Sequence, residues 1–313
     1  MITPTQKGNH AKVHLLLLVS TILVSTSFTV AKIITYSLDP VVLTFVRFLL
    51  AALILLPLIS LKHGLKPGIS ACFRYALISG CLVLFFWSMF LSLRYTTSLN
   101  VSVLFTLVPA ISGMYSIVLV REQFNVNLLL ALIIGLIGAL WVIFQGDIDL
   151  VRTLSWNRGD LIFFGGCLAM GLYTPLIRLL YRNEPMEVMT FWILVTGCIW
   201  LLPGAVLGLL RISWVEIPAS TWLWILYLAV FSTIISFYLT QYATRFIGPT
   251  RTIAYSYLYP ALVMILDLFL GKGWPDIRII PGVILTMATM ILLLVPSFAG
   301  KPTGKNHSSE LRR

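Results

Sequence analysis

Charged residues, histidines and cysteines are all scarce in this sequence, and their scarcity excludes several classes of protein. Charged side chains make up 11% of the 313 residues, with four histidines and four cysteines. The sequence contains no HExxH pair and no glycine-rich P-loop, which excludes a zinc protease of that type and direct ATP hydrolysis. We therefore expect a protein that is not an enzyme and that holds no metal and no cofactor.

The histidines and cysteines that are present show no spacing typical of metal ligands. We expect none of the histidines at membrane depth; they are His10, His14, His63 and His307. The cysteines fall inside apolar segments, without CxxC spacing, and are Cys72, Cys81, Cys167 and Cys198. Isolated cysteines in apolar surroundings behave as small hydrophobic side chains, so we interpret these four as packing residues.

The abundant residues are hydrophobic, at 59% of the chain, and the mean hydropathy is +0.96. Such values lie far outside the range of soluble domains. Ten apolar segments have about the ~20 residues that a helix needs to cross a bilayer. They are 13–35, 40–61, 71–93, 98–120, 127–144, 159–182, 187–210, 219–244, 250–271 and 277–298. Because backbone groups in lipid must bond to one another, we predict an all-α membrane protein with ten transmembrane helices.

The net charge of +11 comes from basic residues that lie mostly between and beyond these segments. If both termini are cytoplasmic, 14 Lys and Arg residues fall on the cytoplasmic side and seven on the other, with Arg47 inside a span. Basic residues accumulate in cytoplasmic loops. We therefore predict a multi-pass protein of the cell inner membrane, with both termini cytoplasmic, that contacts lipids and no nucleic acid.

The stretch from Phe86 to Ile143 recurs without gaps 151 residues later, from Phe237 to Leu294. Matching positions include Phe86-Trp87 with Phe237-Tyr238, Arg94 with Arg245, Pro109 with Pro260, and Arg121 with Lys272. We divide the chain into a cytoplasmic tail (1–12), a first five-helix repeat (13–144), a connecting loop (145–158), a second five-helix repeat (159–298) and a second cytoplasmic tail (299–313). Because five is odd, the second repeat enters the membrane from the opposite side. The predicted fold is two inverted five-helix repeats, a recurring design of secondary transporters.

Three passages make the chain resemble a known family. They are Ser27–Lys32 at the end of the first helix, Asp39-Pro40 followed by Arg47–Ala52, and Leu104–Pro109 leading to Arg121-Glu122. With ten spans in two halves, they resemble the EamA-type carriers of the drug/metabolite transporter superfamily, from Leu15 to Leu294. The resemblance implies a secondary carrier of a small metabolite, and many such relatives export amino acids or related compounds. The chain departs from the sequence pattern of the family at Ser25–Ser27 and at Gly271–Gly273. These departures bear on the substrate and not on the fold.

Charged residues at membrane depth are costly, so each one needs a reason. Arg47 either bonds backbone carbonyls between helices or contacts substrate. Lys32 and Arg178 occupy matching ends of the first and sixth helices, where they either attract an anionic substrate or anchor the helices at the interface. Asp267, which we take as the only acidic residue within a predicted span, either carries a proton during transport or pairs with Lys272 or water near the interface.

Aromatic side chains of the third, sixth, eighth and ninth spans are further candidates for substrate contact. In packing like that of the family, helices one, three, four, six, eight and nine surround the cavity, which favours Trp87, Tyr173, Tyr238 and Tyr257. Aromatic walls suit amphipathic or ring-bearing metabolites. The alternative is that these rings lie at the membrane interfaces, where Tyr and Trp are enriched.

Prolines and glycines mark expected bends and close contacts. Pro109 and Pro260 lie mid-span at matching positions, and Pro175 interrupts the sixth helix. Proline removes a helical hydrogen bond, so we expect these three to act as helix hinges or as fixed kinks. Small residues in the fifth and seventh helices predict close helix packing, namely Gly135, Gly138, Gly204 and Gly208.

We conclude that the sequence encodes a secondary transporter of a small amphipathic metabolite, expected to be an exporter, which works by alternating access and has protons as a candidate coupling ion. One alternative is a membrane enzyme acting on a lipid or a lipid-linked substrate, which would depend on Asp267. Another is a receptor or scaffold, against which the short loops argue. Monomer and homodimer both stay open. We expect the chemistry where the repeats differ, at Ser116 against Asp267, Asn100 against Arg251 and Glu122 against Gly273.

Overall fold

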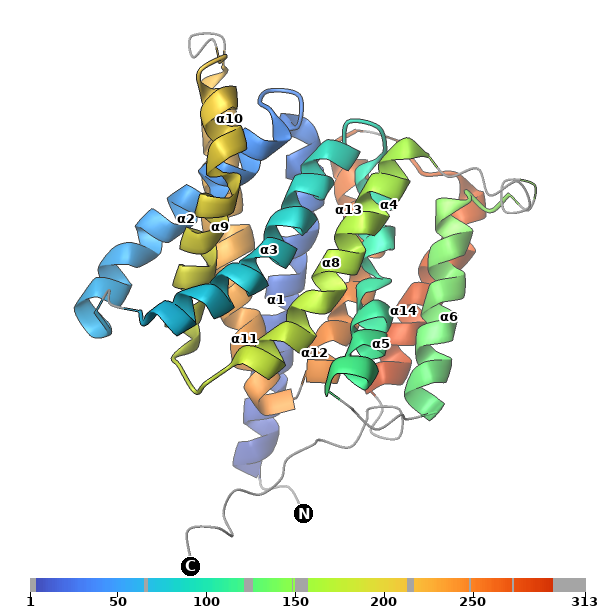
Figure 1. The fold of residues 1–313 in the computed structure, drawn as a ribbon. Coiled ribbons are helices and arrows are strands. Elements are labelled where there is room, and N and C mark those ends of the chain that lie inside the picture. Colours follow the sequence, from blue (N-terminus) through green and yellow to red (C-terminus); the bar gives the residue numbers. More distant parts are fainter. Residues whose placement is uncertain are drawn as a thin grey trace, which may run out of the picture.

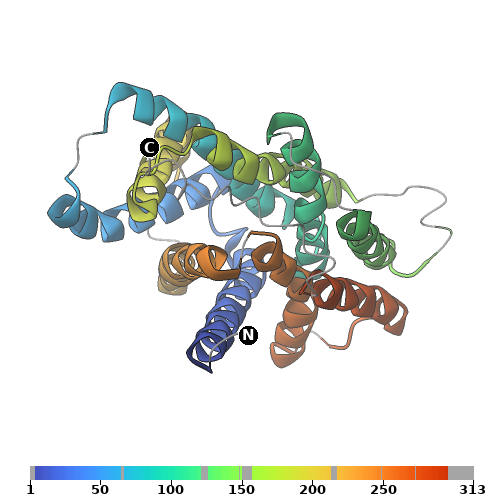
Figure 2. The same ribbon diagram turned by 90° about the horizontal axis from the view of Figure 1, so that it is seen from below.

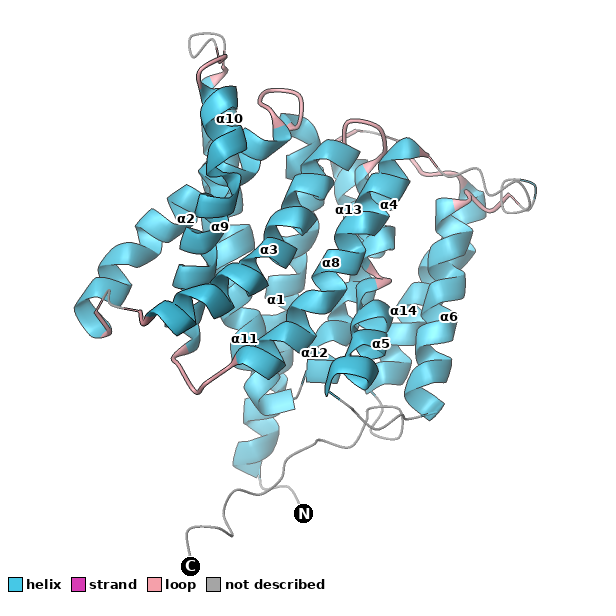
Figure 3. Cartoon of the chain, viewed as in Figure 1, coloured by secondary structure: helices cyan, strands magenta, loops and turns pink. Residues whose placement is uncertain are grey.

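The chain forms a bundle of helices that run side by side (Figure 1). The computed structural model describes residues 4–64, 67–120, 126–147, 149, 157–212, 217–247, 249–271 and 273–294. Within these ranges all regular structure is helical (Figure 3). Nine of the described helices are long and apolar enough to cross a membrane, and the shorter Leu129–Ile143 provides a tenth. The prediction of an all-α membrane protein with ten spans is confirmed.

Six spans are single helices: α1 (Pro4–Ile34), α2 (Pro40–Lys62), α3 (Ile69–Ser92), α6 (Val126–Ile143), α8 (Arg158–Leu180) and α9 (Met186–Leu209). The other four are divided. They comprise α4 (Ser98–Phe105) with α5 (Val108–Val120); α10 (Ala219–Ala229) with the π-helix η2 (Val230–Ile235) and α11 (Ser236–Ile247); α12 (Pro249–Ala254) with the 3₁₀ turn η3 (Tyr255–Leu258) and α13 (Tyr259–Phe269); and the 3₁₀ turn η4 (Ile277–Ile279) with α14 (Ile280–Leu294).

Local sequence explains where these helices begin. Asp39 caps α2 by accepting a hydrogen bond from the backbone N–H of Val41 at 2.9 Å, and Pro40 occupies the first turn, where a helix needs no N–H donor. Asn157 caps α8 in the same way through Gly159. The first helix begins at Pro4, within the predicted tail 1–12, while Arg121, Lys272 and the tail 299–313 lie outside the described residues.

The two ends of the bundle are used below as landmarks. The Arg94 end holds the α1–α2 and α3–α4 connections, the start of α8 and the end of α13. The Arg74 end holds the start of α1, the α8–α9 connection and the junction of α11 with α12. In Figure 1 the Arg94 end is at the top and the Arg74 end is at the bottom.

Contacts between the two halves follow the two-fold relation that inverted repeats require. The second, fourth and fifth spans each pack against their own counterparts, as α2 with α9, α4 with α13 and α6 with α14. The third span packs against the sixth, as α3 with α8, and the first packs against the eighth, as α1 with α11. The first span corresponds to the sixth and the third to the eighth. Exchanging the halves therefore turns the α3–α8 contact into the α1–α11 contact. Figure 2 shows α2 with α9 at one edge of the bundle and α6 with α14 at the other.

The fourth and ninth spans, which are counterparts, are both broken near their middle. Thr106 and Leu107 separate α4 from α5, and η3 separates α12 from α13. Pro109 and Pro260 each lie in the first turn of the helix that follows the break. Pro175, in contrast, lies inside α8, which continues without interruption to Leu180.

The helix α4 and its counterpart α12 differ in the helices that they pack against. At the Arg94 end, α4 packs against α1, α8 and α13. At the Arg74 end, α12 packs against its neighbours α11, η3 and α14, and its described residues show no comparable packing against α1, α8 or α5. The contacts that α4 makes with the opposite half at the Arg94 end are therefore not matched by α12, although η3 packs against α1 and α5 packs against α8.

The small residues predicted to allow close packing do so. A Cβ on Gly208 would lie 2.5 Å from a methyl carbon of Val42, and one on Gly204 would lie 3.1 Å from Val41, so α9 approaches α2 along this face. Gly138 of α6 lies against Gly282 of α14, where a Cβ would come within 2.8 Å of the Gly282 carbonyl oxygen. Close contact through small residues is a common means of helix association in lipid.

Candidate functional site

The two broken spans meet α1 at a group of aromatic rings. Phe28 of α1, Phe105 at the end of α4 and Tyr259 at the start of α13 have ring centroids 5.3–5.9 Å apart. Phe85 of α3 lies 5.4 Å from Phe105 and 5.0 Å from Phe86. We call these five residues the aromatic septum, because rings from both halves fill the centre of the bundle.

Sequence reasoning missed most of the septum. Phe28, Phe85 and Phe105 were not selected, because phenylalanine is common in membrane helices and a single ring carries no signal. The one available signal was position: Phe105 and Tyr259 flank the breaks that precede the matching prolines Pro109 and Pro260. The four aromatic residues favoured from the sequence, Trp87, Tyr173, Tyr238 and Tyr257, lie outside the septum, and Phe86 was noted only as a position where the repeats match.

Arg47 lies beside the septum and is buried, at 1% exposure. Its guanidinium carbon is 4.1 Å from the centre of the Phe86 ring. Its Nε donates to the hydroxyl of Thr233 at 3.0 Å, and its Nη2 donates to the hydroxyl of Ser232 at 3.4 Å. The other terminal nitrogen, Nη1, is buried and has no hydrogen-bond acceptor. Arg47 therefore connects α2 of the first half to η2 of the second half through neutral partners.

The π-helix η2 accounts for the position of those hydroxyls. A π-turn inserts one extra residue into the helix and shifts the register of the side chains that follow. The Thr233 hydroxyl donates to the carbonyl of Leu228, five residues back, at 3.0 Å, and still accepts from Arg47. Ser232 and Thr233, which are adjacent in sequence, can thus both face one guanidinium. Sequence reasoning found Arg47 but not these partners.

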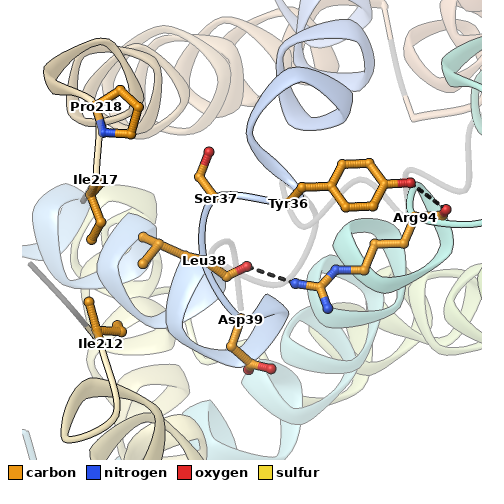
Figure 4. A pocket seen from close by; sticks show the side chains of 8 residues that line it. All are labelled: Tyr36, Ser37, Leu38, Asp39, Arg94, Ile212, Ile217 and Pro218. Atoms are coloured by element: carbon orange, nitrogen blue, oxygen red, sulfur yellow. Dashed lines mark hydrogen bonds between the residues drawn. The ribbon is translucent and has the colours of Figure 1, made fainter.

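Lys32 and Arg94 link the end of α1 to the end of α3 through hydrogen bonds to backbone carbonyls. Lys32 of α1 donates from Nζ to the carbonyls of Leu93 (2.5 Å) and Thr96 (2.9 Å), which follow α3. Arg94 donates to the carbonyls of Thr35 and Leu38, which follow α1, at 3.0 and 2.9 Å. Cations stabilise the negative ends of helices. Figure 4 shows Arg94 directed at Leu38, and the Tyr36 hydroxyl donating to the Arg94 carbonyl.

Asp267 ties α13 to the first half at the same end. Its carboxylate accepts hydrogen bonds from Thr29 of α1 at 3.3 Å and from Ser98, the first residue of α4, at 2.9 Å. The side chain is partly buried. The expected partner Lys272 lies outside the described residues. Asp267 is thus one of the contacts that hold the halves together at the Arg94 end.

The expectation that Asp267 is the only acidic residue in a span is wrong, because Asp160 lies in the first turn of α8 and is 2% exposed. Its carboxylate accepts from the hydroxyl of Thr96 at 2.6 Å and from the side-chain amide of Asn100 at 3.4 Å. Asp160 stands near the edge of its apolar segment, where a carboxylate usually reaches water. The close approach of α8 to the α3–α4 connection covers it.

The remaining residues predicted for the site are dispersed. Trp87 of α3 and Tyr173 of α8 are half-buried on helices that pack against each other. Tyr238 is 64% exposed on α11, and Arg178 is exposed near the Arg74 end of α8. Tyr257 is buried with Ala131 of α6 and Leu293 of α14, away from the septum. The structure therefore does not bring these residues together with Arg47 as one site.

The two tyrosines of η3 and Tyr259 at the start of α13 face three different groups, in keeping with the rotation between alternate residues. Tyr255 bonds His14, with Nδ1 and the hydroxyl oxygen 2.7 Å apart, Tyr257 packs between α6 and α14, and Tyr259 joins the septum. His14, which we expected outside the membrane, lies near the start of the apolar segment Lys12–Ile34.

An ion pair lies at the Arg74 end, between α3 and the α8–α9 connection. Arg74 donates to the Glu184 carboxylate and to the carbonyl of Leu180, both at 2.5 Å. Burial alone raises the pKa of Glu184. The backbone N–H of Arg182 and the Arg74 guanidinium both donate to the carboxylate, and together they outweigh burial, so the pKa lies below its ordinary value. The pair is ionised at neutral pH.

Two open pockets lie at the ends of the bundle. One, of about 530 Å³, is lined by the α1–α2 connection, by Arg94, and by Ile212, Ile217 and Pro218, which precede α10 (Figure 4). The other, of about 310 Å³, lies beside Glu184 at the Arg74 end. Neither includes Arg47 or the septum.

Ten apolar spans arranged as two inverted halves, with counterpart helices broken near the centre, define a membrane transporter built from inverted repeats. The chain belongs to the EamA-like transporter family, within the drug/metabolite transporter superfamily, because the family model matches residues 11–144 and again residues 157–295. The repeat organisation inferred from the 151-residue offset agrees with these two matches.

Relatives support this assignment. The chain is 27% identical over 286 residues to an "Uncharacterized transporter" of Archaeoglobus fulgidus, which covers 90% of this chain and 97% of that protein. It is 24% identical over 286 residues to "Uncharacterized transporter YyaM" of Bacillus subtilis, covering 90% and 93%. A solved crystal structure covers 90% of this chain and 96% of its own, with a TM-score of 0.64 and 19% identity, and shows the same fold.

Proposed function

We propose that this protein is a secondary carrier that exports a small amphipathic metabolite across the cell inner membrane by alternating access, with both termini cytoplasmic. The observation that supports the proposal is the unequal packing of α4 and α12 in two halves whose other spans pack in a two-fold arrangement. Exchanging these two environments would close the Arg74 end and open the Arg94 end, which is the conformational change that a carrier needs.

In this proposal the Arg94 end is the closed gate. Asp267 bonds Thr29 and Ser98, Asp160 bonds Thr96 and Asn100, and Lys32 holds the end of α3. Lys32 therefore serves in gating. With cytoplasmic termini, the conformation described here faces the cytoplasm, and the breaks before Pro109 and Pro260 are the points where the halves flex.

Proton coupling fits the contacts of Asp267. An ionised carboxylate accepts hydrogen bonds from Thr29 and Ser98 at once, whereas protonation removes much of this capacity. We propose that proton uptake at Asp267 releases α13 from α1 and α4 and thereby opens the gate. Asp160, which is buried, adds a second carboxylate at the same end.

The membrane-enzyme alternative is less well supported. It needs Asp267 at a reaction centre, but the described partners of this carboxylate are hydroxyls that join helices at the Arg94 end. The named relatives are transporters. A carrier accounts for both observations.

Transport driven by a pH gradient in liposomes tests the proposal. Purified protein would be screened with amino acids, amines, nucleosides and metal-chelating metabolites, first as wild type and then as Asp267→Asn. We expect at least one compound to move with the gradient, and its gradient-driven rate to fall at least tenfold in Asp267→Asn while equilibrium exchange persists. Movement of none of the compounds would contradict the carrier proposal. An unchanged rate in Asp267→Asn would remove that residue from coupling.

A further inference from the structure

Arg47 is the only cationic side chain that is buried among the side chains the structure describes. Its hydrogen-bond partners are the neutral hydroxyls of Ser232 and Thr233, and its guanidinium also lies over the ring of Phe86. Neither ion pair found among the described residues involves it. A guanidinium in this setting has an uncompensated charge, which is costly in low dielectric and attracts an anion.

The three nitrogens of the Arg47 guanidinium differ in their hydrogen bonding. Nε bonds Thr233 at 3.0 Å, while Nη2 reaches Ser232 only at 3.4 Å and Nη1 has no acceptor. A buried N–H without an acceptor is destabilising, because it has lost its hydrogen bonds to water. The edge formed by Nη1 and Nη2 is the pair of parallel donors that binds the two oxygens of a carboxylate. The Thr233 bond and the Phe86 ring fix the plane of the group, while this edge has one long hydrogen bond and one nitrogen without an acceptor.

We propose that the edge formed by Nη1 and Nη2 of Arg47 binds the carboxylate of the transported metabolite, which replaces Ser232 as the partner of Nη2. The inference rests on the proposed carrier function and names its substrate class, a small monocarboxylate with an apolar or aromatic remainder. A monoanion is favoured over a phosphate because Arg47 provides a single buried positive charge. The apolar part of the ligand lies against the neighbouring rings of the septum, which stack well with aromatic or aliphatic groups.

The position of Arg47 suits this role. It connects α2 of one half to the π-helix of the other, so a ligand that takes over Nη2 exchanges an interaction between the halves for one with substrate. Ser232 lies in the π-turn, and its own carbonyl accepts from the hydroxyl of Ser236. Carboxylate binding would free the Ser232 hydroxyl and favour rearrangement of η2, which couples occupancy to movement of the eighth span.

Thermal-shift titration of the purified full-length protein tests the inference directly. The probes are matched pairs of a carboxylic acid and its carboxamide, such as phenylalanine with phenylalaninamide and phenylacetate with phenylacetamide. For wild type we expect the acids to raise the Tm and the amides to have little effect. Arg47→Gln should weaken the apparent affinity for the acids on the order of 10- to 100-fold, which corresponds to one charged hydrogen-bonded contact.

Three further variants keep the test decisive. Arg47→Lys keeps the charge but not the paired donors, and we expect an intermediate affinity. Ser232→Ala removes the hydroxyl that the carboxylate replaces and leaves Arg47 intact, so it should bind the acids at least as well as wild type. Arg94→Gln is the matched control: it removes an arginine that caps a helix, lowers the Tm, and should keep the preference for acids.

Equal responses to acids and amides in wild type, or an undiminished acid response in Arg47→Gln, would overturn the inference. The same result for Arg94→Gln as for Arg47→Gln would also overturn it, since any lost arginine would then suffice. Failure of the carrier proposal would look different. Acids would bind through Arg47, yet no compound would cross the liposome membrane.

Discussion

At the scale of single residues, several buried or partly buried polar groups join the two halves of this protein. Arg47 of the first half contacts Thr233 of the second, and Asp267 of the second contacts Ser98 of the first. Desolvating such groups is expensive unless each finds a partner. Because those partners come from the opposite half, the polar residues determine how the halves are joined.

The Arg74–Glu184 pair predicts a dependence of stability on pH. The pKa of Glu184 is lower in the folded protein than in the unfolded chain, because the donors from Arg182 and Arg74 outweigh burial. A group of this kind stabilises the fold above its unfolded pKa, and this contribution is lost as the pH falls through its folded pKa. Glu184→Gln should therefore be less stable than wild type at pH 7, by roughly 1 kcal/mol or less, and should approach it below about pH 4.

Tm measured from pH 7 to pH 3 would check this difference. Glu187→Gln is a suitable control, because Glu187 is more exposed and reaches His63 at 3.4 Å. A constant gap between wild type and Glu184→Gln over the whole range would contradict the assigned ionisation.

Sequence reasoning found the rare residues at this scale and missed the common ones. Arg47 and Asp267 were identified because a charge inside an apolar run has few explanations. Asp160 was overlooked because it lies at the edge of its segment, where burial depends on how α8 meets the α3–α4 connection. Phe28, Phe85 and Phe105 were missed because a phenylalanine in the core and one in the septum have the same sequence pattern.

At the scale of helices, the two matching prolines indicated breaks in their spans, whereas Pro175 did not. Pro109 and Pro260 follow breaks in counterpart spans, whereas Pro175 is accommodated within α8. Proline in the first turn needs no hydrogen bond of its own, so it marks a new helix start after a break. The sequence predicted a bend but placed it at the prolines. Pro109 lies two to three residues beyond the break at Thr106 and Leu107, and Pro260 lies two residues beyond the end of η3.

The break between α4 and α5 predicts a kinetic effect. Pro109 has no N–H to offer the carbonyl of Phe105, four residues back, and an alanine there would supply one. Pro109→Ala should extend the helix across Thr106 and Leu107, stiffen the fourth span and slow exchange transport by about tenfold with little change in ligand affinity. Pro175→Ala is the matched control and should have a small effect.

Exchange rates in liposomes, together with ligand-dependent Tm, would separate rate from affinity. A Pro109→Ala protein that exchanges substrate at the wild-type rate would remove the hinge role. An equal decrease of the exchange rate in Pro175→Ala would show that the effect does not depend on the break between α4 and α5.

At the scale of the whole molecule, the repeat predicted the topology but not the conformation. The 151-residue offset and five spans per half were enough to infer inverted repeats, and the exchange of the α3–α8 and α1–α11 contacts has the form that this symmetry requires. In the proposed mechanism, the end that is closed depends on the positions where the repeats differ. Two of those positions, Asn100 and Asp267, contribute hydrogen bonds at the Arg94 end. The side chain of Arg251 and all of Glu122 lie outside the described structure.

The central claim is that the two ends open in turn, and pairs of spin labels at repeat-related positions measure this most directly. Tyr95 and Phe269 lie at the Arg94 end, and their counterparts Phe246 and Val118 lie at the Arg74 end. All four are exposed, so labels should be tolerated once the four native cysteines are replaced. Each pair joins one half to the other.

Pulsed electron resonance would give both distances with and without a saturating transported compound. The account predicts opposite changes on addition of that compound: the distance between positions 95 and 269 lengthens while the distance between positions 118 and 246 shortens. Distances that do not respond to the compound, or that change in the same direction at both ends, would contradict alternating access between the inverted halves.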